Sequence, residues 1–216
     1  MADDSPADEP DRLPPQAFAR IDEGDDLAFY SFPRLVNHID EVAIAALSAT
    51  YQQLIPENAA ILDLMSSWVS HLPDDLPTAQ VIGHGMNEEE LAANPRLTSW
   101  FIQDLNQDQT LPLDSGSLDA VLCCVGMQYL QHPIEIATEV RRVLKPGGQF
   151  LVSFSNRCFW TKAVAVWLGT TDGQHAWLVS EYFARAGGFD AAETLDLSPG
   201  GLGDPLWAVV ARRAVG

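Results

Sequence analysis

The fold of this chain is decided by two segments, Ser117-Leu118-Asp119-Ala120-Val121-Leu122 and Glu139-Val140-Arg141-Arg142-Val143-Leu144-Lys145-Pro146-Gly147-Gly148-Gln149-Phe150-Leu151-Val152. The first segment is short, apolar and rich in β-forming residues, which predicts a strand. A helix is predicted over residues 133–145, ending before the breaker Pro146-Gly147-Gly148, and a second strand is predicted from Phe150. Strand, helix and strand in this order form a βαβ unit of a parallel sheet.

Further strands and helices are predicted on both sides of this unit. Amphipathic spacing predicts a long helix from about Val36 to Leu54, and two more helices are expected at residues 159–168 and 175–186. The last two strands are expected to form an antiparallel hairpin. The predicted fold class is therefore α/β, a Rossmann-like doubly wound and mostly parallel seven-stranded sheet with a C-terminal hairpin. Its strands are expected at residues 60–64, 80–83, 99–102, 117–124, 149–154, 189–197 and 206–211.

Length and composition predict one domain behind an acidic leader. The chain has 216 residues, of which 47% are hydrophobic, and this is enough to bury one sizeable core. Residues 1–26 combine many carboxylates with prolines, so we expect a leader that is solvated and disordered rather than packed. The predicted organisation is a leader at residues 1–26 and a single domain at residues 27–216.

Charge and hydropathy exclude several function classes. A formal charge of −18 repels nucleic-acid phosphates and anionic membrane surfaces, so neither is an expected partner. No apolar run approaches the length of a membrane span, and the N-terminus lacks a signal-peptide pattern. The cysteines, Cys123, Cys124 and Cys158, indicate a reducing compartment. We therefore expect a cytoplasmic protein, and the histidine and acid spacing predicts no metal site.

The segment Arg142-Val143-Leu144-Lys145-Pro146-Gly147-Gly148, together with the Asp119-Ala120 strand, resembles the class I S-adenosylmethionine-dependent methyltransferases. The resemblance is to their small-molecule, type 11-like branch, and it covers roughly residues 59–197. It implies a Rossmann-like fold, S-adenosylmethionine as the cofactor and methyl transfer to a small molecule. The aromatic segment beyond residue 155 suits a cover over an apolar or aromatic substrate, although such rings also serve as core packing.

The resemblance places the cofactor loop after the strand at 60–64. The family has a glycine-rich loop here, because a backbone without Cβ atoms approaches the cofactor closely. This chain keeps Asp63, which is also a candidate helix cap. It has Met65, Ser67 and Val69 where the family has glycines, so we expect a bulkier and tighter loop. In this interpretation, Ser66 and Ser67 replace the glycine contacts with hydroxyl groups.

Of the two other cofactor-binding elements implied by the resemblance, this chain lacks one and keeps the other. About 22 residues after Asp63, where a ribose-binding carboxylate is expected, the chain has Gly85. His84 or Asn87 is then the expected substitute contact, and Asn87 is also expected to cap a short helix that begins with three glutamates. The family's adenine-binding acid is matched by Gln103-Asp104-Leu105. The expected cofactor-binding residues are Asp63, Met65, Ser66, Ser67, His84, Gly85, Asn87, Gln103, Asp104, Leu105 and Val125.

Two residues in the loop after the strand at 117–124 are candidates for catalysis. Tyr129 stands where many family members have a catalytic or positioning His or Tyr. His132 has a near-neutral pKa as a free side chain, which suits a general base. Both also have structural interpretations, since Tyr129 can pack on the sheet and a histidine before proline often lies in an exposed turn.

Two functions remain open from the sequence. The first is S-adenosylmethionine-dependent methyl transfer to a small, apolar or aromatic molecule. The second is a catalytically inactive methyltransferase-like protein that acts as a binding or assembly partner, because the loop has lost its glycines and the second strand has lost its carboxylate. A nicotinamide enzyme is disfavoured, since no Gly-x-Gly-x-x-Gly sequence follows a predicted strand. The sequence leaves the methyl acceptor and the oligomeric state undetermined.

Overall fold

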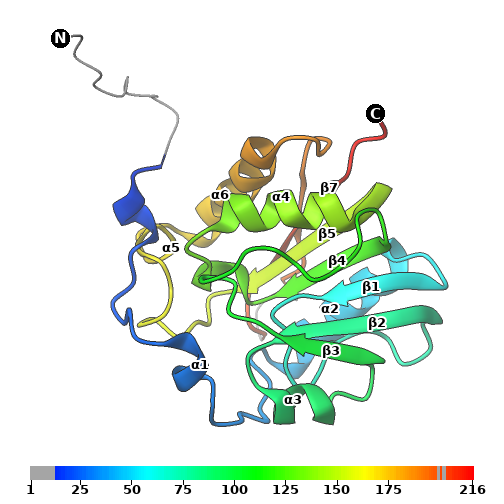
Figure 1. Ribbon diagram of the computed structural model, residues 1–216, viewed down its shortest axis with the longest axis horizontal. Helices are drawn as coiled ribbons and strands as arrows, with labels where there is room; N and C mark the ends of the chain where they lie inside the picture. Colours follow the sequence, from blue (N-terminus) through cyan, green and yellow to red (C-terminus); the bar gives the residue numbers. More distant parts are fainter. Residues whose placement is uncertain (1–12, 199, 201–202) are drawn as a thin grey trace.

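A computed structural model describes residues 13–198, 200 and 203–216, and one seven-stranded sheet runs through them (Figure 1). The strand order is β3-β2-β1-β4-β5-β7-β6. Strands β1 to β5 pair in parallel, whereas β7 is antiparallel to both β5 and β6. This confirms the predicted fold class. The strands are β1 Ala59–Asp63, β2 Thr78–Gly85, β3 Ser99–Ile102, β4 Leu118–Cys124, β5 Leu144–Ser155, β6 Glu193–Asp196 and β7 Leu206–Arg212.

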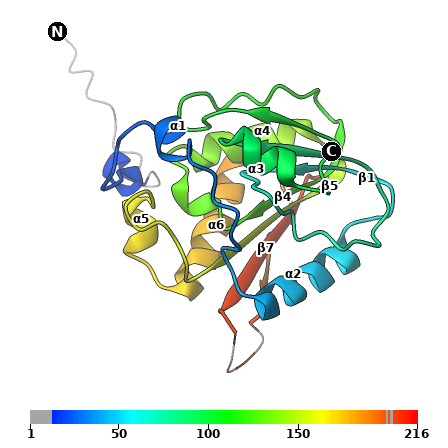
Figure 2. The same ribbon diagram turned by 90° about the horizontal axis from the view of Figure 1, so that it is seen from below.

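Helices cover both faces of the sheet. Helix α2 lies on one face, while α4 and α6 pack together on the other, as the turned view shows (Figure 2). Shorter helices occupy the loops at the edges. The α-helices are α1 Asp26–Phe29, α2 Glu41–Leu54, α3 Glu88–Ala93, α4 Pro133–Val143, α5 Ala165–Leu168 and α6 Asp172–Ala186, and the 3₁₀ helices are η1 Pro15–Phe18 and η2 Met127–Tyr129.

Each covered face has its own apolar core. Beneath α2, Leu47 packs with strand residues such as Ile61 and Leu122. Beneath α4 and α6, Val140 and Phe183 belong to the second cluster. The two sets alternate along the strands, because successive strand side chains point to opposite faces. Strand β1 is buried along its whole length, as expected for a central parallel strand.

The segment that decides the fold differs from its prediction at the helix–strand junction. Helix α4 ends at Val143, and β5 begins at Leu144, so the Pro-Gly-Gly sequence lies inside the strand. The pairing of β4 with β5 shifts register between Leu118 and Ala120, which marks a bulge. Gly147 has a φ of +79°, a conformation that glycine adopts without a Cβ penalty. The predicted breaker thus bends a strand instead of separating two elements.

Other predicted boundaries move for local reasons. Helix α2 begins at Glu41 rather than near Val36, because the Asp40 side chain accepts a hydrogen bond from the Ala43 N–H and caps it. The helix expected at 159–168 is reduced to α5, and α6 begins at Asp172 behind a capping box formed by Thr171 and Gln174. Strand β6 is shorter than expected and begins at Glu193.

The described part of the predicted acidic leader packs on the domain, which corrects the expectation that residues 1–26 are solvated and disordered. Residues 1–12 lie outside the described residues. Within residues 13–26, the partly buried Leu13 and Phe18 pack against the core beneath α4 and α6. Asp26 is only 3% exposed, because it forms salt bridges with Arg20 at 2.6 Å and with Lys162 at 2.9 Å. Oppositely charged partners make burial of these acidic residues favourable.

We call residues 20–38 the N-terminal strap. The strap crosses from the Lys162 region to the start of α2 and is visible as the blue segment along one side of the sheet (Figure 1). Its backbone is tied at one end by a hydrogen bond from the Asp22 N–H to the Thr161 carbonyl oxygen. No helix in the described ranges is long and apolar enough to cross a membrane.

We expect Asp26→Ala to lower the free energy of unfolding by about 3–5 kcal/mol, measured by urea denaturation. The reason is that Arg20 and Lys162, whose side chains are 5% and 1% exposed, would stay buried without their shared carboxylate. The matched control is Asp25→Ala, which removes an exposed cap on α1 and should cost about 1 kcal/mol. Equal losses in the two variants would contradict the anchoring role of Asp26.

Candidate functional site

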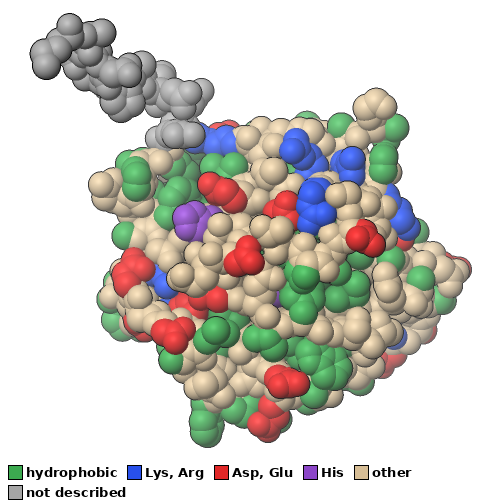
Figure 3. Space-filling model, viewed as in Figure 1, with side chains coloured by type: hydrophobic (Ala, Val, Ile, Leu, Met, Phe, Trp, Pro, Cys, Tyr) green, Lys and Arg blue, Asp and Glu red, His purple; other side chains and the backbone are tan. Residues whose placement is uncertain are grey.

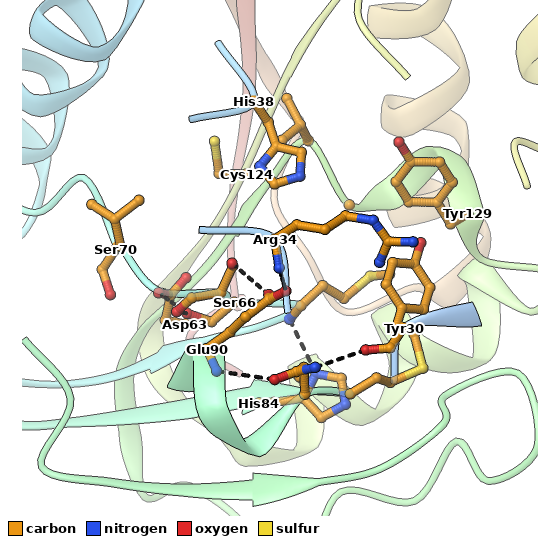
Figure 4. Close-up of a pocket in the computed structure, with 18 of the residues that line it drawn as sticks. Tyr30, Arg34, His38, Asp63, Ser66, Ser70, His84, Glu90, Cys124 and Tyr129 are labelled. Atoms are coloured by element: carbon orange, nitrogen blue, oxygen red, sulfur yellow. Dashed lines mark hydrogen bonds between the residues drawn. The ribbon is translucent and has the colours of Figure 1, made fainter. Parts of the chain in front are cut away.

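The candidate site lies where the strand order reverses, between β1 and β4. Strands β2 and β3 follow β1 on one side, whereas β4 and β5 lie on the other, so the carboxyl ends of β1 and β4 face a common crevice. A cleft with a cavity of about 100 Å³ opens there (Figure 4). Its lining comes from the ends of β1, β2 and β4, from α3 and from the strap.

Asp63 occupies the floor of the cleft at the end of β1. Its side chain is almost fully buried, and the Ser66 hydroxyl donates a hydrogen bond to Oδ2 at 2.6 Å. Burial raises the pKa of the Asp63 carboxyl to about 6, and the hydrogen bond from Ser66 opposes this shift. Ser70 is a second hydroxyl neighbour that lowers the Asp63 pKa. A buried carboxyl with few polar neighbours is suited to bind a cationic or hydrogen-bond-donating group.

Strained backbone positions gather around the cleft. Met65, His71 and Val125 have φ values of +58°, +56° and +47°, and all three line the cavity. For a β-branched residue such as Val125 this conformation is an outlier. Strain of this kind costs about 1–3 kcal/mol per residue and is concentrated in functional sites. The loops after β1 and β4 are thus held in shapes that local preferences alone do not produce.

Glycines lie beside the loop rather than in it. A Cβ atom on Gly85 would lie 2.7 Å from the Ser66 carbonyl oxygen, and one on Gly126 would lie 2.9 Å from the Met65 Cβ. Both distances are shorter than side chains tolerate, so only glycine fits at these two positions. The predicted bulkier loop is accommodated by small residues on the neighbouring strand ends.

His84, near the end of β2, connects two loops of the site. The Met65 N–H donates to its Nδ1 at 3.0 Å, which leaves the ring hydrogen on Nε2, where the Gln103 carbonyl oxygen lies 3.0 Å away. Burial lowers the pKa of the His84 imidazole to about 4, so the ring is neutral at pH 7. Both ring nitrogens have protein partners, and His84 therefore positions the loops after β1 and β3.

Glu90 is the carboxylate that the end of β2 lacks. It lies in the first turn of α3 and is nearly buried. Its Oε1 accepts a hydrogen bond from the Arg34 backbone N–H and its Oε2 one from the Ser67 hydroxyl, each at 2.6 Å. Asn87 caps α3, as predicted, and its amide also donates to the Tyr30 and Ser31 carbonyl oxygens. The strap is thereby joined to the cofactor-loop region.

The Arg34 side chain lies in the cleft among aromatic rings. Its guanidinium carbon is 4.8 Å from the Phe29 ring centroid, 5.7 Å from that of Tyr30 and 5.5 Å from that of Phe159. Such cation–π contacts contribute about 0.5–2 kcal/mol each. Figure 4 shows Arg34 between Tyr30 on one side and Asp63 and Ser66 on the other. The strap thus covers the cleft and fills much of it.

The structure brings together most of the residues predicted from sequence and separates the others. The Gln103 amide donates to the Asp108 and Thr110 carbonyl oxygens, and Leu105 belongs to the core. Asp104 accepts a hydrogen bond from the Asn106 N–H and does not line the cleft, and burial raises its pKa. His132 lies in a separate groove beside α4. The predicted residues that line the cleft are Asp63, Met65, Ser66, Ser67, His84, Gly85, Asn87, Val125 and Tyr129.

Tyr129 separates the cleft from a second cavity of about 160 Å³, which we call the side pocket. Its hydroxyl oxygen accepts a hydrogen bond from the Phe159 N–H at 2.9 Å. Burial raises the pKa of Tyr129 to about 12, so the hydroxyl stays protonated at pH 7. The side pocket is lined by His38, Val125, Tyr129, Arg157, Cys158 and Phe159.

Sequence reasoning missed four residues of the site, which are Arg34 and His38 from the strap, Glu90 from α3 and Phe159 from the loop after β5. One feature of the sequence could have identified Arg34 as a site residue, because it is the sole Lys or Arg between residues 21 and 95. Glu90 had a weaker signal, as one of three glutamates in a helix. Phe159 and His38 had none, since their roles depend on how distant segments pack.

Charged side chains are unevenly distributed over the face shown in Figure 3. Figure 3 shows Lys and Arg side chains gathered in the upper part of the molecule, near α4, whereas Asp and Glu are spread over the remaining visible surface. Arg141 and Arg142 belong to the last turn of α4, where cations favour the helix dipole. In the part of the chain that the structure describes, no group of three or more His, Cys, Asp or Glu residues is arranged to hold a metal ion.

Comparison with known proteins gives one family and consistent relatives. A methyltransferase domain family matches residues 66–152. The malonyl-[acyl-carrier protein] O-methyltransferase of Hahella chejuensis is 27% identical over 139 residues, covering 61% of this chain and 49% of that protein. The ubiquinone biosynthesis O-methyltransferase of Xanthomonas oryzae pv. oryzae is 31% identical over 113 residues, covering 52% and 43%. The chain thus spans about half the length of these relatives.

Solved structures show the same fold. A methyltransferase structure from Aquifex aeolicus, described as dependent on S-adenosylmethionine, aligns with a TM-score of 0.58 and 14% identity. The alignment covers 87% of this chain and 97% of that one. At this level of identity, the likeness supports the arrangement of the sheet and its helices.

We expect Asp63→Asn to become more stable relative to the wild type as pH rises from about 4 to about 7, by up to about 3 kcal/mol. The pKa of Asp63 is raised from 3.8 to about 6, so the folded state holds the proton more tightly than the unfolded state. Its stabilising effect is therefore complete below the unfolded pKa and is lost as pH rises through the folded pKa. Urea denaturation at several pH values measures the difference.

The matched control for this prediction is Asp196→Asn on β6. The pKa of that exposed carboxyl is lowered by its hydrogen bonds with Ser198, so it remains ionised throughout the same pH range. We expect no rise in its relative stability. A flat pH dependence for Asp63→Asn as well would show that the Asp63 carboxyl is not buried as described.

Proposed function

We propose that this chain is a class I S-adenosylmethionine-dependent methyltransferase of the type 11 kind, and that it binds S-adenosylmethionine in the cleft and methylates a small apolar or aromatic molecule. The observation that carries the proposal is the convergence of Asp63, Glu90 and the strained Met65 and Val125 at the crevice between β1 and β4. Open parallel sheets bind their ligands at this position.

The donor groups of the cleft suit this cofactor chemically. S-adenosylmethionine carries ammonium and sulfonium cations and ribose hydroxyls, and the cleft offers the carboxyls of Asp63 and Glu90. The hydroxyls of Ser66 and Ser67 already bond these two carboxyls, and a ligand can exchange with them. When bound, the cofactor supplies an activated methyl group, so the protein has mainly to bind and align.

Room for the cofactor depends on the strap. The cavity of about 100 Å³ is smaller than the roughly 300–1,000 Å³ of small-molecule sites. Arg34 and Tyr30 line this cavity, and both belong to the strap. We infer that the structure is the closed form and that the part of the strap around Tyr30 and Arg34 moves when the cofactor enters. The anchor formed by Arg20, Asp26 and Lys162 lies at the other end of the strap, so a local opening can leave it intact.

The remaining predicted residues take indirect roles in this proposal. His84 holds the loops after β1 and β3, and Gln103 contributes through its carbonyl oxygen. Tyr129 forms the wall between the cleft and the side pocket. His132 lies in the separate groove beside α4 and therefore does not line the cleft. We propose oxygen as the acceptor atom, because both curated relatives described above are named O-methyltransferases.

A non-catalytic binding role is the second candidate. The small cavity favours it, as do the hydrogen bonds that join the polar groups of the cleft to one another. In this alternative the strap fills the crevice permanently, and the fold serves as a platform for another molecule. The two candidates differ in one property, which is affinity for the cofactor.

We expect Met65→Gly to raise the affinity for S-adenosylhomocysteine about tenfold, or about 1.4 kcal/mol, in calorimetric titration. The change removes a side chain from the cleft and replaces a residue at φ +58° with one that adopts this conformation freely. The wild type should bind S-adenosylmethionine and S-adenosylhomocysteine with measurable heat.

The matched control is Asn58→Gly, which relieves a similar φ of +60° outside the cleft and should leave the affinity unchanged. Absence of binding by both the wild type and Met65→Gly, with both proteins folded, would contradict the methyltransferase proposal and favour the non-catalytic role.

A further inference from the structure

The side pocket has the size of one aromatic ring. Its cavity measures about 160 Å³, and an engineered apolar cavity of about 150 Å³ in another protein binds benzene. It shares His38, Val125, Tyr129 and Phe159 with the cleft, so a group bound there would lie directly beside the proposed cofactor position. Nothing in the family match or the relatives assigns a ligand to this pocket.

The walls of the side pocket are aromatic and fixed. The Phe159 ring lies between two others, with its centroid 5.9 Å from that of Tyr129 and 5.8 Å from that of His38. The rings of His38 and Phe159 meet edge to face at 88°. The hydrogen bond from the Phe159 N–H to the Tyr129 hydroxyl joins two of these walls. Aromatic ligands favour such surroundings, because offset and edge-on contacts complement ring quadrupoles.

His38 is the polar group of the pocket that remains available. Among the described residues, neither of its ring nitrogens has a hydrogen-bond partner, whereas the Tyr129 hydroxyl accepts one from Phe159. The Arg157 guanidinium is already paired with Asp204 at 2.7 Å. Burial lowers the pKa of the His38 imidazole, and the nearby Arg34 adds to this effect while Glu90 opposes it. His38 is therefore neutral at pH 7 and able to accept a proton.

We propose that the side pocket binds a monocyclic phenol and that His38 accepts the hydrogen bond of its hydroxyl group. This inference rests on the proposed function, in which the phenol oxygen is the methyl acceptor. In the transfer, a bond would form between the phenol oxygen and the methyl carbon, and the methyl–sulfur bond of the cofactor would break with its electron pair staying on sulfur. The O–H bond of the phenol breaks, its electron pair stays on oxygen, and the proton moves to the free imidazole nitrogen of His38. His38 is then the general base of the reaction, a role that sequence reasoning had assigned to His132 as a candidate.

Related ligands complement the side pocket less well than a phenol does. A single ring matches the cavity volume of about 160 Å³, and an unsubstituted hydrocarbon leaves His38 without a partner. A benzoate has to compete with Asp204 for Arg157, and it offers no proton to a neutral imidazole. His38 lies at the end of the strap near Val36, whose carbonyl oxygen accepts a hydrogen bond from the Trp68 indole N–H at 3.1 Å, so His38 keeps its place when Tyr30 and Arg34 move.

The test is a set of binding titrations on the full chain, monitored by ligand-observed NMR with phenol, toluene and benzoate. We expect phenol to bind about tenfold more tightly than toluene, since one hydrogen bond contributes about 0.5–1.5 kcal/mol. His38→Ala removes the acceptor together with one wall of the pocket, so it should weaken the binding of both ligands and abolish the preference for phenol over toluene. Phe159→Ala should weaken both. The matched control is Asn37→Ala, which changes an exposed neighbour on the strap and should affect neither.

The base role is separated from binding by His38→Gln. Its amide oxygen still accepts a hydrogen bond, so phenol should bind within about twofold of the wild type. Glutamine does not take up the proton, so methylation of phenol should be lost. Equal affinities for phenol and toluene in the wild type, a retained preference in His38→Ala, or tightest binding of benzoate would each overturn the proposal.

Titration with S-adenosylhomocysteine keeps this inference distinct from the proposed function. A chain that binds S-adenosylhomocysteine but not phenol retains its methyltransferase assignment, and the phenol site is overturned. A chain that binds phenol through His38 but not S-adenosylhomocysteine retains the pocket, and the methyl-transfer step is overturned.

Discussion

The reversal of strand order between β1 and β4 is the constraint on which the site depends. Two parallel strands that pair with each other but lead their connections in opposite directions leave a crevice at their carboxyl ends. A crevice of this kind exposes backbone groups and apolar side chains unless something covers it. In this chain the cover is the N-terminal strap, held by the buried carboxylate of Asp26 at one end and joined to Glu90 near the other. The cofactor therefore competes with Tyr30 and Arg34 for space in the cleft, whereas the end of the strap at Val36 is held by the Trp68 indole.

The sequence predicted the sheet well because strand burial and helix amphipathicity are local patterns. Buried apolar runs marked every central strand, and the capping residue Asn87 marked the start of α3. The prediction of a turn at Pro146-Gly147-Gly148, between the helix and the strand, was wrong. Strand β5 already begins at Leu144, and these residues form a bulge within it, which uses the same residue types as a turn. The prediction for residues 13–26 was wrong for another reason. Its acidic residues were predicted to be solvated, because the sequence does not show that Lys162, which is distant along the chain, lies beside Asp26.

The position of the site was predicted better than the set of residues that form it. The loop after β1 was expected to be tight, and the structure shows how this is achieved, with Gly85 and Gly126 giving way to Ser66 and Met65. Asp63 and Ser66 were found through spacing along one strand and its loop. Arg34, Glu90 and Phe159 were not, since three separate segments bring them to the cleft. The residues implied by the resemblance lie in the cleft where they follow β1, β2 and β4, and outside it in the loop after β3.

Hydrogen exchange of the strap, measured with and without S-adenosylhomocysteine, tests the central claim most directly. If the strap is a closed cover that yields to the cofactor, amides near Arg34 should exchange through a local opening far more readily than those of β1 and β4. Added S-adenosylhomocysteine should change exchange in the strap and in the loop at Met65 and Ser66 together. Protection of the strap equal to that of the central strands, with no response to the ligand at either segment, would contradict it.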